Sequence, residues 1–256
     1  MGSRKVLCFS IYSSLLFLFV SCSRNKIAVE PAPQVLNSKK VALSLYYETL
    51  CPYCRNFIVV DLAKVVKTDL MSILDLKLIP WGNAIRQSNN TIICQHGEDE
   101  CYLNTIHACI INILPDVMKH FKFIKCIEEQ SSPPIIAQNG AEASWKLCAQ
   151  QLKFSSEAIK DCYDSGRGKQ LLLQYGSKTD NLNPPHKYVP WVVVNETPLL
   201  EDYGNFVAYV CKSYKGKPTP KACGSHPSNS IYEKMSNQSF CSESPAMVQM
   251  KKEPQA

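Results

Sequence analysis

The spacing of apolar residues changes several times along this chain of 256 residues, and each change marks a predicted element. Runs rich in β-branched and other apolar residues at 41–47 and 74–81 predict strands, while the apolar residues of 54–70 recur at helical spacing. Two strands joined through one helix usually pair in parallel with a right-handed crossover. Residues 41–81 therefore predict a βαβ unit.

The second part of the chain first turns helical and then returns to strands. Helical spacing predicts four helices, at 104–123, 141–152, 155–163 and 168–175. Strand-rich runs follow at 188–194 and 197–200, and a last helix is predicted at 203–214. The order β-α-β, helices, β-β-α is that of an α/β thioredoxin-like fold with a helical insertion at about residues 83–187.

Both ends of the chain differ in composition from the middle. Arg4 and Lys5 precede an apolar stretch at 6–20 and then small residues, a pattern typical of a secretory signal peptide at 1–23. Fifteen apolar-biased residues are fewer than the roughly 20 that a membrane span needs, and no later run is longer, so no membrane span is expected. Polar segments at 24–40 and 224–256 predict flexible ends around one domain at 41–223.

The charge pattern argues against a nucleic-acid partner. The formal net charge of +6 falls to +4 without Arg4 and Lys5, and the sequence has no long basic run. Three N-x-S/T sequences suggest surface glycans, in agreement with a secretory signal peptide. Their asparagines are Asn89, Asn195 and Asn237.

A Cys-x-x-Cys sequence stands at the junction of the first strand and the first helix. Cys51-Pro52-Tyr53-Cys54 places Cys51 where the unpaired N–H groups and partial positive charge of a helix start favour a thiolate. Proline suits an early helical position, and Cys54 lies three residues on, close enough to form a disulfide with Cys51. The same spacing suits half of a zinc site or a structural bridge, so the motif alone leaves three interpretations open.

The chain has thirteen cysteines, about 5% of its residues, which favours an oxidising compartment. Removal of a signal peptide would take Cys8 and Cys22, and Cys241, in the polar tail, is predicted to be an odd thiol. The remaining eight are predicted to form four structural disulfides: Cys94, Cys101, Cys109, Cys126, Cys148, Cys162, Cys211 and Cys223. Eight cysteines allow 105 connectivities, among which we favour Cys211 with Cys223 and Cys148 with Cys162.

Residues with metal-ligand chemistry also gather between 94 and 109. Cys94, His96, Cys101, His107 and Cys109 could supply zinc ligands, but their spacing fits none of the usual paired patterns. Disulfides are the better prediction in an oxidising lumen, so no metal site is predicted.

The stretch from Cys94 to Cys101, Cys-Gln-His-Gly-Glu-Asp-Glu-Cys, followed by Asn104 and Cys109, resembles the signature of the gamma-interferon-inducible lysosomal thiol reductase family. The match continues through Trp145, Cys148, Cys162, the run 184–195, Cys211 and Cys223, and so spans about residues 41–223. The resemblance implies a thioredoxin-like fold and reduction of protein disulfides in acidic compartments. It also implies that Cys51 is the attacking thiol and Cys54 the resolving thiol. In thioredoxin-like proteins a cis-proline begins the strand that faces the Cys-x-x-Cys, and the resemblance implies this role for Pro190.

Together these observations predict a thiol-disulfide oxidoreductase of the secretory pathway, in a lysosome or vacuole or outside the cell, that needs no metal or organic cofactor. Its partners would be disulfide-containing proteins and a small-molecule or protein thiol as reductant. A lumenal oxidase or isomerase is one alternative, because Pro52-Tyr53 is the dipeptide of glutaredoxins, whose potentials of about −200 to −230 mV are less reducing than that of thioredoxin. A secreted binding protein with a merely structural Cys51–Cys54 bridge is the other.

Overall fold

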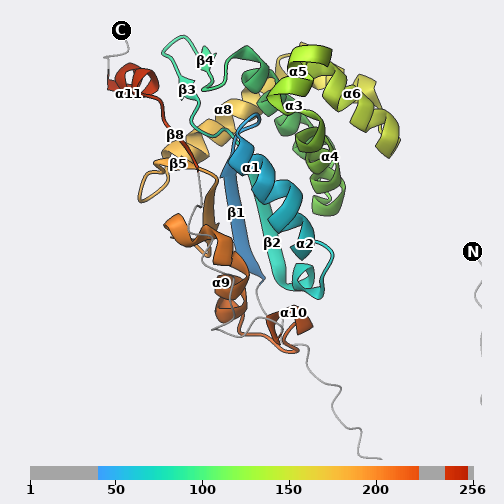
Figure 1. The fold of residues 1–256 in the computed structure, drawn as a ribbon, viewed down its shortest axis with the longest axis vertical. Helices are drawn as coiled ribbons and strands as arrows, with labels where there is room; N and C mark the ends of the chain where they lie inside the picture. The colour runs from blue at the N-terminus through green and yellow to red at the C-terminus, as the bar shows by residue number, and fades with distance from the viewer. Residues whose placement is uncertain (1–39, 225–239, 253–256) are drawn as a thin grey trace, which may run out of the picture. The chain divides into compact units, whose positions relative to one another are not determined.

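A four-stranded sheet in the order β2-β1-β6-β7 lies at the centre of the fold (Figure 1). The structure, a computed structural model, describes residues 40–224 and 240–252. The predicted signal peptide at 1–23 and nearly all of the predicted flexible segment at 24–40 lie outside the described residues.

The four strands combine one parallel pair with two antiparallel pairs. β1 (Val41–Tyr47) and β2 (Leu74–Pro80) are parallel, as the βαβ prediction requires. β6 (Trp191–Val194) runs antiparallel to β1, and β7 (Thr197–Pro198) runs antiparallel to β6. Alternate residues of β1 are fully buried, which is the pattern of a strand with one face against the core.

One continuous helical segment connects β1 to β2. It consists of α1 (Pro52–Asn56), the π-helical η1 (Phe57–Leu62) and α2 (Ala63–Val65), and the 3₁₀ helix η2 (Asp69–Ile73) leads into β2. The segment begins two residues earlier and ends five residues earlier than the 54–70 that the sequence predicts, because Thr68 adopts an extended conformation and starts the next short helix.

The last helix of the sheet domain packs beside this segment. The ring of Phe57 lies 5.7 Å from that of Tyr203, in the 3₁₀ helix η3 (Leu200–Asn205), and 5.2 Å from that of Phe206, in α9 (Phe206–Ser213). The βαβ unit and the β-β-α unit therefore share one sheet, and two of their helices meet over its core. This is the thioredoxin-like topology, and the predicted fold class is confirmed.

A helical insertion follows β2 and gathers at the end of the sheet where β1 leads into α1 (Figure 1). It opens with a short hairpin and continues with helices: β3 (Ile85–Arg86), β4 (Ile92–Ile93), α3 (Glu98–Ile113), α4 (Val117–Gln130), α5 (Pro133–Asn139), α6 (Ala141–Leu152), α7 (Ser156–Asp164) and α8 (Arg167–Asp180). The single helix predicted at 104–123 is wrong, because Pro115 interrupts it and the Asp116 side chain caps a new helix start.

The segment around Pro190 forms two short strands in place of one. β5 (Tyr188–Val189) ends at the proline, and β6 begins directly after it. A proline has no N–H to donate to a ladder, so it stands between the strands. The short helix α10 (Lys221–Gly224) closes the first described range.

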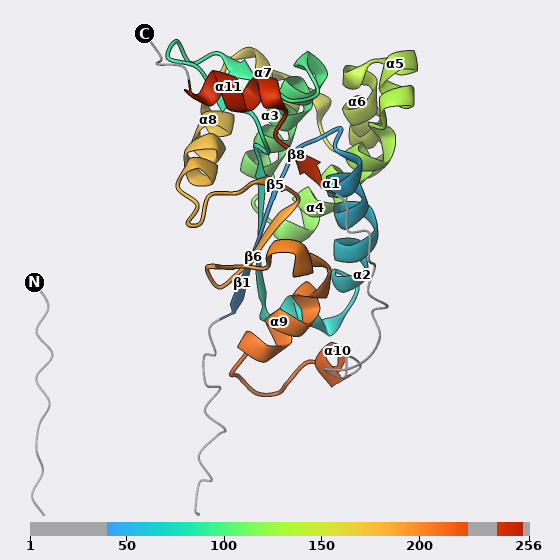
Figure 2. The ribbon, with the colours of Figure 1, turned by 60° about the vertical axis from the view of Figure 1, so that its left-hand side comes forward.

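The C-terminal segment differs from the flexible tail that the sequence predicts at 224–256. Within it, β8 (Cys241–Ser242) pairs antiparallel with β5, and α11 (Pro245–Lys252) follows (Figure 2). The pairing explains the difference, since an isolated two-residue strand gives no sequence signal until its partner is known. Among the described residues, no helix has the length and apolar character needed to cross a membrane.

Candidate active site

Cys51 lies where the strand β1 gives way to the helix α1. It is the residue that caps the start of the helix, with an extended backbone (φ −77°, ψ 117°), and Pro52 occupies the first helical position. The carbonyl oxygen of Cys51 accepts the first helical hydrogen bond, from the Arg55 N–H at 3.0 Å. The unpaired N–H groups at this helix start favour negative charge on a nearby sulfur. The structure thus has the local geometry that the sequence predicts for Cys51.

Cys54 lies three residues on and is buried. Among the described cysteines it is the one free thiol, and its exposed fraction is 0%. Burial raises the pKa of the Cys54 thiol well above its ordinary value, and the neighbouring carboxyl of Glu48 raises it further. Cys54 is therefore held as a thiol that a large partner cannot reach.

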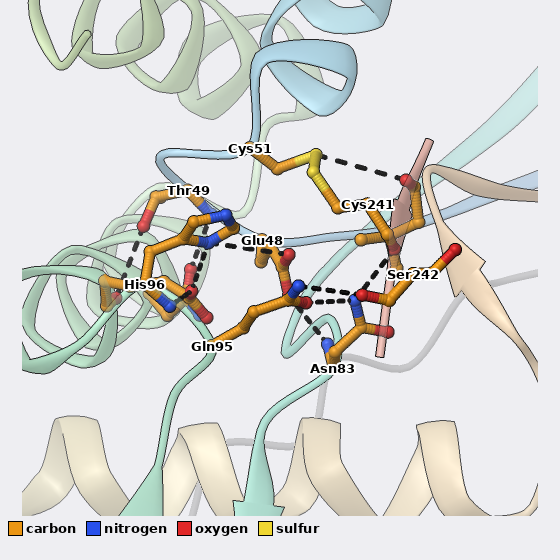
Figure 3. The surroundings of a disulfide bond; sticks show 11 residues. Glu48, Thr49, Cys51, Asn83, Gln95, His96, Cys241 and Ser242 are labelled. Atoms are coloured by element: carbon orange, nitrogen blue, oxygen red, sulfur yellow. Dashed lines mark hydrogen bonds and ion pairs between the residues drawn. A yellow bond between two sulfur atoms is a disulfide. The ribbon is translucent and has the colours of Figure 1, made fainter. Parts of the chain in front are cut away.

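The disulfide partner of Cys51 is Cys241 and not Cys54 (Figure 3). The two Cα atoms are 6.3 Å apart, although the residues are separated by 190 positions in the sequence. The prediction of Cys241 as an odd thiol is therefore wrong. The reason is that β8 pairs with β5 and places Val189 opposite Cys241. The polar composition of the tail does not predict this tertiary contact.

Pro190 lies beside the same disulfide. The Val189–Pro190 peptide bond is cis, and the Val189 carbonyl oxygen is 4.0 Å from the Cys51 sulfur. The structure thus brings together Cys51, Cys54 and the strand entry at Pro190, the three residues that the sequence assigns to the site.

Glu48 and His96 adjoin the disulfide (Figure 3), and a second buried carboxyl, that of Glu100, contacts His96. Glu48 and Glu100 are both 0% exposed. One carboxyl oxygen of Glu100 accepts a 2.7 Å hydrogen bond from the backbone N–H of His96 and lies 2.7 Å from Nδ1 of the His96 ring. Glu48 Oε1 lies 3.7 Å from the same ring nitrogen. Burial raises the pKa of Glu100 to about 8 and that of Glu48 well above its ordinary range, and the Glu100 carboxyl raises the Glu48 pKa further.

The Cys94–Cys101 stretch orders the turn that precedes Cys51. A disulfide joins Cys94 and Cys101, and the Asn104 side chain accepts a 2.9 Å hydrogen bond from the backbone N–H of Thr49. The Asn104 amide also donates to Glu100 at 3.3 Å. The stretch is visible in the sequence, but its role is not, because that role depends on contacts with Thr49, which lies about 50 positions away.

A second buried polar group lies under β1. The Tyr47 hydroxyl is 3.0 Å from Nδ1 of His107, and Glu128 Oε1 is 3.9 Å from the same nitrogen. Burial lowers the pKa of His107 to about 3 and raises that of Glu128 to about 8. Both the Glu128 carboxyl and the His107 imidazole are therefore uncharged in mildly acidic solution.

Comparisons with known proteins agree with this geometry. The family model described as "Gamma interferon inducible lysosomal thiol reductase (GILT)" matches residues 42–152. A gamma-interferon-responsive lysosomal thiol protein of Arabidopsis thaliana is 44% identical over 197 residues, which cover 75% of this chain and 79% of that protein. The chain belongs to this family. It is a thiol-disulfide oxidoreductase.

Two further matches are less similar to this chain. A gamma-interferon-inducible lysosomal thiol reductase of Mus musculus is 39% identical over 195 residues, 73% of each chain. The DsbA of Chlamydia trachomatis superposes with a TM-score of 0.47 and 12% identity over 62% of this chain and 78% of that chain.

The other cysteines of this thiol reductase all form disulfides within the described residues. Cys211 pairs with Cys223, which is the pairing we favoured. The favoured Cys148–Cys162 pair is absent, because α6 lies against α4 and α7 against α3, so that the bonds are Cys126–Cys148 and Cys109–Cys162. Disulfides thus occupy the sulfurs of Cys94, Cys101 and Cys109, the three cysteines considered as zinc ligands.

One group of residues has atoms spaced as metal ligands would be. Ligand atoms of Glu48, His96 and Cys241 lie within 4.8 Å of one another, but the disulfide with Cys51 occupies the Cys241 sulfur. Of the three predicted glycosylation sites, Asn89 and Asn195 are exposed, and Asn237 lies outside the described residues.

Proposed function

We propose that this reductase acts through a Cys51/Cys54 dithiol on protein disulfides in an acidic compartment of the secretory pathway. One observation carries the assignment of roles. The Cys51 sulfur is bonded to a cysteine of another segment, while Cys54, on the same helix start, stays a buried thiol. An attacking cysteine must be able to bond to sulfurs of other segments or molecules. A resolving cysteine needs to reach only the sulfur of the attacking cysteine.

The proposed cycle follows from these two roles. The Cys51 thiolate attacks a substrate disulfide, one substrate thiol leaves, and a mixed disulfide forms. Cys54 then gives up its proton and attacks the Cys51 sulfur, so that the second substrate thiol leaves and a Cys51–Cys54 disulfide forms. A small-molecule or protein thiol returns the two electrons and restores the dithiol.

Acidic operation favours a thiol with a lowered pKa. At pH 5 a thiol with a pKa near 8.5 is ionised to about 3 parts in 10,000, whereas one with a pKa near 5 is half ionised, a gain of about 3.2 log units. The weaker nucleophile loses about 1.6 of these, so that a net advantage of roughly 40-fold remains. The helix start at Cys51 supplies such an environment.

The neighbouring carboxyls favour the same conditions. With their raised pKa values Glu48 and Glu100 are protonated at pH 5 and place no negative charge beside the Cys51 sulfur. Glu100, with a pKa of about 8, begins to ionise in neutral or alkaline solution, and its charge then opposes a thiolate. The predicted signal peptide, the five disulfides of the described residues and the lysosomal relatives support a lumenal location.

Reduction of insulin by Cys51→Ser and Cys54→Ser, at pH 5 and at pH 7, tests the proposal. Both variants should lose at least about 100-fold in rate at pH 5, because each lacks one sulfur of the cycle, while their melting temperatures stay within a few degrees of wild type. Retained reduction in both variants would show that the Cys51/Cys54 pair is structural and does not carry the activity. A potential of the Cys51/Cys54 couple near −120 mV would instead identify an oxidant.

A further inference from the structure

The C-terminal segment 240–252 occupies a site built for it beside Cys51. β8 pairs antiparallel with β5, so that Cys241 faces Val189 and Ser242 faces Tyr188. The Asn83 side chain donates a 2.9 Å hydrogen bond to the carbonyl oxygen of Cys241, and the Gln95 side chain donates one of 2.8 Å to that of Ser242 (Figure 3).

Side chains of the same segment add further contacts. The ring of Phe240 stacks on that of Tyr188, with centroids 4.2 Å apart and planes 23° from parallel. Met247, in α11, is 3% exposed, and α11 packs against β3. The segment is therefore held by a strand pairing, two side-chain hydrogen bonds and apolar contacts in addition to its disulfide.

The docked segment closes the reactive end of the site. Cys51 and Cys54 are both 0% exposed, and Cys241, which covers Cys51, is 8% exposed. A substrate disulfide cannot approach the Cys51 sulfur along its bond axis while Cys241 is bonded there.

We propose that Cys241 is a third redox-active cysteine of this enzyme, and that segment 240–252 is an internal substrate which caps Cys51 as an intramolecular mixed disulfide. The proposal rests on the function proposed for Cys51, because only an attacking cysteine has a substrate position to occupy. The segment is then bonded to Cys51 as a protein substrate is in the mixed disulfide, after the attack by Cys51 and before the attack by Cys54.

The release of the cap is the resolving step of the proposed cycle. Cys54 loses its proton and attacks the Cys51 sulfur, the Cys51–Cys54 disulfide forms, and the Cys51–Cys241 disulfide breaks. Cys241 leaves as a thiolate and takes up a proton. One disulfide replaces another, so that no electrons enter or leave until an outside thiol reduces the Cys51–Cys54 pair.

The cap competes with substrates through its proximity. A tethered thiol has an effective concentration on the order of millimolar or more, whereas protein substrates in an assay are micromolar. Once a substrate is bonded to Cys51, the tethered Cys241 thiolate should therefore attack the Cys51 sulfur faster than an outside thiol does, unless Cys54 resolves the bond first or the segment leaves its site. The Cys51–Cys241 disulfide then forms, and the substrate leaves as a thiol.

Gln95, a residue of the family signature, helps to hold segment 240–252 in its site. It lies between Cys94 and His96 and holds the backbone of Ser242, while its amide oxygen accepts a 2.6 Å hydrogen bond from Asn83. The loop that orders the approach to Cys51 thus also holds the segment that caps it.

A trapping experiment tests the proposal. Reduced Cys54→Ser and reduced Cys54→Ser/Cys241→Ser are each incubated with insulin at pH 5, quenched with acid and alkylated. The double variant should hold at least about fivefold more insulin in mixed disulfides, because no tethered thiol displaces the substrate. The single variant should instead yield a Cys51–Cys241 peptide by mass spectrometry. Cys54→Ser/Ser242→Ala, which keeps all the sulfurs of the single variant, is the matched control and should behave like it.

The outcomes separate the two proposals. Equal trapping by the single and double variants, with no Cys51–Cys241 peptide, would overturn the cap and leave the role of Cys51 intact. The absence of trapping in both folded proteins would overturn the attacking role of Cys51 itself. If the double variant fails to fold, Cys54→Ser/Gln95→Ala replaces it, since it keeps Cys241 and removes the hydrogen bonds that the Gln95 side chain makes with Ser242 and Asn83. Trapping about twofold above the single variant would then support the cap, and trapping no higher would overturn it.

Discussion

Two cysteines three residues apart receive opposite environments in this protein. Cys51 caps a helix start, where unpaired N–H groups stabilise a thiolate, and Cys54 is buried, where its pKa is raised. The difference comes from position along one helical turn and needs no nearby cation.

This difference predicts unequal alkylation in the reduced Cys241→Ser variant, in which the cap no longer competes. Cys51 should react with iodoacetamide at least about 10-fold faster than Cys54 at pH 6, with an apparent pKa well below 8.5. Peptide mapping by mass spectrometry measures both rates, and Cys54→Ser/Cys241→Ser isolates the Cys51 signal. An apparent pKa near 8.5 for Cys51 would remove the argument for acid specialisation.

Gly82 shows how closely the chain approaches the buried Glu48. Its φ is +62°, in the left-handed region, and a Cβ atom added there would overlap the Glu48 side chain. The residue is therefore glycine for two reasons, its backbone conformation and the space that the carboxyl occupies.

Gly82→Ala should lower the free energy of unfolding by about 2–4 kcal/mol, of which about 1 comes from the left-handed conformation and the rest from the overlap. Gly166→Ala is the matched control, because its φ is +75° but its added Cβ would meet open space. It should cost only about 1 kcal/mol. Urea unfolding measures both, and equal losses would show that the Glu48 contact is unimportant.

At the scale of elements, the break between α3 and α4 is set by capping. Helical spacing of apolar residues continues from 104 to 123, yet the chain turns at Pro115, and Asp116 accepts hydrogen bonds from the N–H groups of Met118 at 2.8 Å and Lys119 at 3.3 Å. The turn lets α4 run back along α3 and reach η1, which continues the helix that carries Cys54.

Asp116→Ala should therefore cost about 1 kcal/mol of stability, or roughly 2–4 °C in melting temperature, because two N–H groups lose their partner. Asp116→Asn keeps the capping oxygen and should change stability by less than half as much. Thermal unfolding followed by circular dichroism measures the change. A loss as large in Asp116→Asn would point to the charge and not to the cap.

For the whole molecule, buried carboxyls couple stability to pH. The pKa values of Glu100 and Glu128 rise from the ordinary 4.5 to about 8 on folding. The folded state therefore binds extra protons between these values, and stability falls as the pH rises through that window. His107 acts in the opposite sense below pH 6.5, because its pKa falls to about 3 and the unfolded chain takes up its proton first. The two effects together place maximal stability in mildly acidic solution.

The free energy of unfolding should accordingly fall by about 1–3 kcal/mol between pH 6.5 and pH 8, where the contribution of the carboxyls exceeds that of His107. Denaturant unfolding at several pH values measures the slope. Glu100→Gln should flatten it, whereas the exposed Glu157→Gln should not. A slope that is the same in all three proteins would mean that Glu100 is already ionised at pH 6.5.

The sequence by itself determined what depends on neighbouring residues. The βαβ unit, the start of the helix at Cys51 and the strand entry at Pro190 follow from local periodicity and from the backbone limits of proline, and the structure has all three. The family signature was also visible, although its contacts were not. These predicted features are present in the structure because each depends on residues within a few positions of one another in the chain.

Only the tertiary structure decided the bonds between distant segments. The pairing of Cys51 with Cys241 spans 190 positions, and Cys126–Cys148 and Cys109–Cys162 depend on which helices pack together. Glu48, Asn83 and Glu100 look like surface residues in the sequence, and their burial follows from the docking of the signature loop against the end of β1. Cysteine and carboxyl chemistry depends on which groups approach within a few ångströms, and residue spacing does not encode that distance.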